Sequence, residues 1–138
     1  MRVTVTKEES TRKVLEGGVY GQGLDHEADV ELVTFEWPAE TNPGFDKDGK
    51  QGPWALFVAR VVDAEGNQHF PKKYVAGPGL ARTLTAIGVA FESRAEGGFD
   101  FDDEDVAGRK IRGIEVKAPR EYNDTMYTGD ISAFIAND

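Results

Sequence analysis

Apolar and polar residues follow a strand-like pattern in five stretches of this chain. Residues 29–37 and 126–136 alternate along most of their length, as a strand with one buried face does. Residues 54–62 are almost continuously apolar, which indicates a strand covered on both faces. Residues 68–75 and 109–118 complete the set. We therefore predict five strands.

One segment follows the helical period instead. Leu80, Leu84 and Ile87 recur at positions i, i+4 and i+7, which predicts a helix over residues 77–87. Gly88 follows directly and matches a left-handed C-terminal cap.

Turn formers separate these elements. Proline and glycine interrupt residues 38–53 every few positions, so we predict a long loop there. Residues 63–67 predict a hairpin turn, and Pro71 places the following strand at an edge or a bulge. Residues 90–105 predict an acidic connection that ends in a helical turn, and residues 119–124 a hairpin loop.

The first residues have a different character. Residues 1–14 are mostly polar and predict a lead-in segment, with a short strand at residues 3–5. Four glycines within residues 17–23 suit a strand that starts with a bulge or a tight bend. We place the single folded domain at residues 15–138.

The order strand, strand, strand, helix, strand, strand is typical of the OB-fold. That fold is a five-stranded barrel with a helix between strands three and four. We therefore predict a mainly β, OB-fold-like barrel.

Several short motifs also resemble a known family. Leu15, Gly18 and Tyr20 form an opening of leucine, two residues, glycine, one residue and tyrosine, and Gly108-Arg109-Lys110 leads into the fourth strand. Over residues 15–136 the chain resembles small bacteriophage OB-fold proteins, although Arg109 stands where that family usually has lysine. The resemblance implies a single-stranded DNA-binding or replication-associated protein.

Composition narrows the class of protein. The 138 residues match one domain, and 39% hydrophobic with 30% charged residues fits neither a disordered chain nor a membrane protein. The chain has no cysteine, and no apolar stretch is long enough to span a membrane. We therefore expect a cytoplasmic protein, in the host cytoplasm if a phage encodes it. The net charge of −9 repels nucleic acid on average, so any such binding depends on local charge.

The sequence contains few residues that could form a catalytic site. The only serines are Ser10, Ser93 and Ser132, none in a nucleophile elbow, and His26 and His69 lie far apart in sequence. We therefore expect no enzyme, no cofactor and no metal. The acidic run at residues 99–105 could gather oxygens around a cation, but a solvated acidic loop explains it better.

Aromatic and basic residues occupy the places that bind oligonucleotides in OB-folds. Those places are the middle strands and the loops after strands one and four, where rings stack on bases and cations contact phosphates. The candidate binding residues are Trp37, Phe45, Lys50, Trp54, Arg60, Phe70, Lys72, Lys73, Tyr74, Arg112, Lys117, Arg120 and Tyr122.

Two alternatives stay open. Trp37, Trp54, Phe57 and Phe70 could instead be core residues of the barrel. The chain could also be a protein-interaction module, such as a virion component or a host-factor binder, that uses its acidic surface without catalysis.

Overall fold

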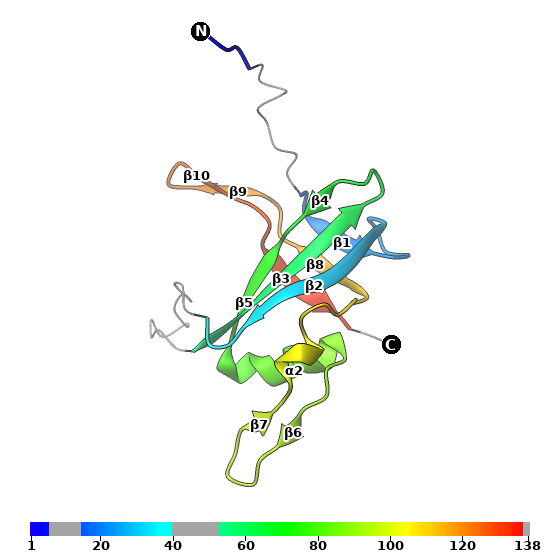
Figure 1. Ribbon diagram of the computed structural model, residues 1–138, viewed down its shortest axis with the longest axis vertical. Helices are drawn as coiled ribbons and strands as arrows, with labels where there is room; N and C mark the ends of the chain where they lie inside the picture. Colours follow the sequence, from blue (N-terminus) through cyan, green and yellow to red (C-terminus); the bar gives the residue numbers. More distant parts are fainter. Residues whose placement is uncertain (6–14, 40–52, 137–138) are drawn as a thin grey trace.

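We describe the protein from a computed structural model that places residues 1–5, 15–39 and 53–136 (Figure 1). This part of the chain is mainly β, with two larger sheets, two small hairpins and one α-helix. The predicted mainly β class with a single helix is therefore confirmed. The predicted loop at residues 38–53 and most of the lead-in segment lie outside the described residues.

The larger sheet is built around one long central strand. Strand β3 (Trp54–Asp63) pairs antiparallel with β2 (Ala28–Glu36) on one side and with β4 (Gln68–His69) and β5 (Lys72–Ala76) on the other. The register of β2 shifts between Leu32 and Thr34, where the slip in the alternation predicts a bulge.

Strand β3 buries only one of its faces. Ala55, Phe57, Ala59 and Val61 are fully buried, whereas the residues between them remain half-exposed. The prediction that β3 is covered on both faces is therefore wrong, because the residues on its outer face keep part of their surface exposed. Phe57 is a core residue, as the alternative interpretation expects.

The smaller sheet has the order β1–β8–β11. It consists of β1 (Gly18–Gly21), β8 (Gly113–Val116) and β11 (Ile131–Ile135), all antiparallel. Gly21 and Gly113 face one another across the first pair, and a Cβ at either position would clash with backbone of the opposite strand. The sheet needs glycine there because the two backbones approach so closely.

Single bridges connect the two sheets. The amides of Gly108 and Ile111 donate to the carbonyls of Leu32 and Val30 at 2.6 and 3.1 Å, and the Lys72 amide donates to Gly129 at 2.8 Å. These isolated contacts do not form continuous ladders, and the described strands form no closed barrel.

The helix α2 (Gly77–Ile87) has the predicted bounds and the predicted cap. Leu80, Leu84 and Ile87 point into the core. Gly88 adopts a left-handed φ of 80°, and the amide of Val89 donates to the carbonyl of Leu84 at 2.9 Å. This geometry closes the last turn of the helix.

The remaining elements differ in part from the predictions. No strand forms at residues 3–5. The acidic connection forms a hairpin of β6 (Glu92–Ser93) and β7 (Phe99–Asp100), followed by the expected helical turn, the 3₁₀ helix η1 (Asp103–Asp105).

The last two predicted strands are divided. Only residues 113–116 of the predicted 109–118 strand form β8. Residues 119–124 do not form a simple loop, because β9 (Arg120–Tyr122) pairs with β10 (Thr125–Tyr127). The predicted 126–136 strand is interrupted at residues 128–130, after which β11 begins.

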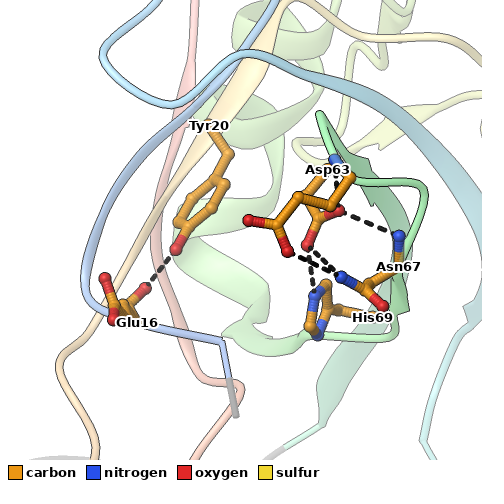
Figure 2. A network of polar contacts seen from close by, with 6 residues as sticks. Glu16, Tyr20, Asp63, Asn67 and His69 are labelled. Atoms are coloured by element: carbon orange, nitrogen blue, oxygen red, sulfur yellow. Dashed lines mark hydrogen bonds and ion pairs between the residues drawn. The ribbon is translucent and has the colours of Figure 1, made fainter. Parts of the chain in front are cut away.

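The turn between β3 and β4 is held by one carboxylate (Figure 2). Asp63 accepts hydrogen bonds from the amides of Glu65 and Asn67 at 3.0 and 2.9 Å, and its other oxygen lies 3.2 Å from Nε2 of His69. Burial raises the pKa of Asp63, but the hydrogen bonds from Asn67, His69 and Glu65 outweigh it and lower the pKa from 3.8 to about 2.

This carboxylate should make the stability of the fold sensitive to acid. Because the folded pKa lies below the unfolded one, its contribution is present above about pH 3.8 and is lost as the pH falls towards 2. We expect Asp63→Asn to lower the free energy of unfolding at neutral pH and to flatten its decline between pH 4 and pH 2, measured by urea denaturation. Asp105→Asn removes an exposed carboxylate and should leave that decline unchanged; equal pH profiles for Asp63→Asn and the unsubstituted protein would contradict the assignment.

Candidate functional site

The predicted binding residues do not form one cluster. Phe45 and Lys50 lie outside the described residues. The others fall into five places: the outer face of β3 and β5 with the β9–β10 hairpin, the inner side of β5, the end of β2, the break between β4 and β5, and a pocket beside β2.

The outer face of β3 and β5 carries a mixed apolar and cationic track. Lys72 and Tyr74 are two residues apart on β5 and pair with Val58 and Leu56 of β3. The ammonium of Lys72 lies 5.8 Å from the centroid of the Tyr74 ring. Trp54 lies on the same face, four residues along β3 from Val58 and so about 13 Å away.

The β9–β10 hairpin presents a second aromatic and cationic surface. The cross-strand pairs Arg120–Tyr127 and Tyr122–Thr125 lie on one face of the ribbon. The Arg120 guanidinium lies 5.7 Å from the centroid of the Tyr127 ring. Tyr122 is 65% exposed, and Tyr127 is 42% exposed. This face therefore offers two accessible rings next to a cation.

A two-residue turn produces this arrangement. Asn123 and Asp124 both have positive φ, 49° and 64°, as a type I′ hairpin turn requires. Asn and Asp tolerate this conformation better than other residues with a Cβ. The turn fixes the register, and the register places Arg120 opposite Tyr127. Sequence reasoning missed Tyr127 because it assigned residues 119–124 to a loop.

Contacts at its base attach the hairpin to β5. The amide of Lys72 donates to the carbonyl of Gly129 at 2.8 Å, and the amide of Lys117 donates to the carbonyl of Asp130 at 2.9 Å. The Asp130 carboxylate lies 3.9 Å from the Arg120 guanidinium. These bonds hold Lys72 near Arg120, although the hairpin itself projects away from the sheets (Figure 1).

Lys73 points away from Lys72. Its ammonium donates to the carbonyl of Ser132 at 3.1 Å, on the side of β5 that faces β11. Burial lowers the pKa of Lys73, and the charge of nearby Lys117 lowers it further. Lys73 and Lys117 therefore form a separate basic pair on the inner side of β5.

The two tryptophans lie where β2 ends and β3 begins, at one end of the larger sheet. Trp37 is 42% exposed, so its ring is not in the core, and it contacts the start of α2 near Gly77. Trp54 is half-buried, and its ring nitrogen has no hydrogen-bond partner among the described residues. Phe70, at the break between β4 and β5, is 59% exposed. The core interpretation is therefore wrong for Trp37 and Phe70.

Arg60 and Arg112 lie in a pocket of mixed charge. The pocket has a volume of about 380 Å³ and also includes Asp29, Glu31 and Lys110. Arg60 forms an ion pair with Glu31. These carboxylates offset the arginines, so this pocket is a poorer match for phosphate than the hairpin face.

Within the described residues, no group of histidine and carboxylate side chains is arranged to hold a metal ion. No helix in this part of the chain is long and apolar enough to cross a membrane. Comparisons with protein-family models, curated proteins and solved structures found no match. The function must therefore be inferred from the geometry of this chain alone.

The attachment of the hairpin depends on Gly129. Its φ of 69° lies in the left-handed region, where a residue with a Cβ costs about 1–2 kcal/mol. A Cβ at this position would meet no atom closer than the Pro71 Cα at 3.8 Å, so the cost is one of backbone conformation. We expect Gly129→Ala to lower the free energy of unfolding by about 1 kcal/mol and to speed hydrogen exchange of the Lys72 amide. The control Thr128→Ala should change neither; unaltered exchange at Lys72 in Gly129→Ala would disprove the attachment.

Proposed function

We propose that this protein binds single-stranded nucleic acid, with DNA as the expected ligand, without strong sequence preference. The observation that carries the proposal is the pairing of rings with cations on two connected surfaces, where the two hairpin rings are exposed and the Tyr74 ring is half-buried. Tyr74 lies beside Lys72 on β5, and Tyr122 and Tyr127 lie beside Arg120 on the hairpin.

The chemistry of these residues suits a flexible strand. Bases stack on aromatic rings whatever their sequence, and each stacked base adds about 1–3 kcal/mol. Cations next to the rings contact the phosphates that connect those bases. Trp54, Leu56 and Val58 extend the track along the outer face of β3 with half-exposed apolar surface. We assign stacking to Tyr74, Tyr122 and Tyr127.

An OB-fold-like barrel is part of the same proposal. The bridges from β2 to residues 108–111 and from β5 to Asp130 join the strands in the order that a five-stranded barrel requires. The parallel bridge between Lys72 and Asp130 supports this order most directly. In an OB-fold barrel the third and fifth strands, here the predicted strands at residues 68–75 and 126–136, pair in parallel. In that arrangement the hairpin is the loop between the last two strands, one of the loops that binds oligonucleotides in OB-folds.

The charges on the hairpin face differ from the net charge of the protein. The net charge is −9, but Glu121 lies on the opposite face of the hairpin from Arg120 and Tyr122. The Asp130 carboxylate lies 3.9 Å from the Arg120 guanidinium, and the backbone carbonyl of the same residue accepts the Lys117 amide at the base of the hairpin. We expect weak binding that strengthens at low salt, because counterions displaced from the phosphates gain more entropy when they are released into dilute salt.

Binding should respond to salt in proportion to the phosphates contacted. Lys72 and Arg120 together should give a slope of log affinity against log salt of about −1.4, and Arg120→Gln should reduce it to about −0.7. A fluorescence titration with labelled oligo-dT over a series of salt concentrations measures both. Absence of binding at low salt, or the same slope in both proteins, would rule out the assigned contacts.

Stacking on the hairpin can be tested independently of charge. We expect Tyr122→Ser to weaken oligo-dT binding roughly 5- to 150-fold, because it removes one stacking platform. Met126→Ser changes an equally exposed residue on the opposite face of the same hairpin and should leave affinity unchanged. Equal losses in the two variants would indicate a change in the hairpin as a whole and would contradict the stacking role.

A further inference from the structure

A second cavity lies between the end of β2 and the segment that follows α2. Its volume is about 620 Å³. Phe35 of β2 and Trp37, the residue that follows β2, line one side of it, and Phe91 and Phe101 line the other. The rings of Phe35 and Phe101 meet edge to face with centroids 5.6 Å apart. The floor of this cavity is therefore largely aromatic.

The floor is continuous with the hydrophobic core. Phe35 also contacts the fully buried Phe57, at 5.0 Å between centroids. Phe99 joins Phe91 and Phe101 at 5.1 and 6.0 Å. Because each phenylalanine ring of the floor packs against another ring, the floor is formed before any ligand binds.

Carboxylates surround this aromatic floor. Glu92, Asp100, Asp102 and Asp103 line the cavity and are exposed, and among the described residues that line it there is neither lysine nor arginine. Asp102 accepts a hydrogen bond from the amide of Glu104 at 2.9 Å, and Asp100 lies 3.8 Å from Arg94. In the part of the chain that is described, Glu92 and Asp103 have no ion-pair partner.

This chemistry selects a cationic ligand with an apolar stem. The carboxylates repel phosphate, so the cavity is unsuited to the strand proposed for the hairpin face. Lysine and arginine lay their aliphatic stems on apolar surface and direct their charge outward, and arginine also stacks on aromatic rings. We propose that this cavity binds a basic segment of a partner protein, in which arginine or lysine lies next to an apolar side chain.

The cavity and the hairpin face lie far apart. In Figure 1 the β9–β10 hairpin projects from one end of the molecule, and the β6–β7 hairpin, which carries Glu92 and Asp100 of the cavity rim, projects from the other. A basic segment and a nucleic acid strand could therefore bind at the same time. The inference does not depend on the proposed nucleic acid binding.

A short capped peptide of alternating arginine and leucine is a suitable probe. We expect saturable binding by calorimetry, with chemical-shift changes in NMR spectra at the Trp37 indole and the amides of Phe91 and Phe101. A peptide of alternating glutamate and leucine should not bind. Shift changes elsewhere, or binding of the glutamate peptide, would overturn the proposal.

A charge-matched pair of variants tests the rim. We expect Glu92→Gln with Asp103→Asn to weaken binding of the arginine peptide roughly 2- to 30-fold, as two exposed ion pairs are lost. Glu104→Gln with Asp105→Asn removes the same charge from exposed residues of η1 that do not line the cavity, and should have little effect. Equal losses in the two variants would show a general charge effect and overturn the site. Cavity shifts that appear when the protein alone is concentrated would identify a second copy of this chain as the occupant and would also overturn it.

Discussion

Burial of the inner face of β3 is the interaction on which the rest of the fold depends. Ala55, Phe57, Ala59 and Val61 are completely removed from solvent, and β3 pairs with strands on both sides. Because side chains alternate along a strand, fixing this face inward also fixes the outward direction of Trp54, Leu56 and Val58. The apolar surface available for binding is thus a consequence of how the core is filled.

The charges of this protein are divided between two ends with different chemistry. One end combines rings with cations in the hairpin and the start of β5, and the other combines rings with carboxylates around the cavity beside η1. A net charge of −9 averages over this difference and describes neither surface. Aromatic side chains are shared by both surfaces, so the neighbouring charge decides which ligand each one favours.

Local patterns predicted the local elements well. The spacing of Leu80, Leu84 and Ile87 and the cap at Gly88 depend only on neighbours in sequence, and the helix has the expected bounds. The hairpin of β9 and β10 was missed because a turn of only two residues, Asn123 and Asp124, is hard to separate from a loop rich in turn formers.

The composition of the site depended on contacts distant in sequence. Lys72 and Lys73 were expected to act together, but the strand period of two already places neighbours on opposite faces, and Lys73 reaches the Ser132 carbonyl instead. The Arg60–Glu31 pair and the contact between Phe35 and Phe101 join residues that are distant in sequence, and no sequence period reveals such contacts. The predicted mainly β class with one helix is confirmed, whereas the OB-fold barrel is a proposal, because the described strands form no closed barrel.

The bond between the Lys72 amide and Gly129 has a further consequence for the solubility of the protein. Strand β5 forms one border of the larger sheet, and an unoccupied border offers amides and carbonyls to strands of other molecules. Gly129 and Asp130 occupy part of this border from within the same chain. The segment that positions the hairpin therefore also shields the sheet against edge-to-edge aggregation.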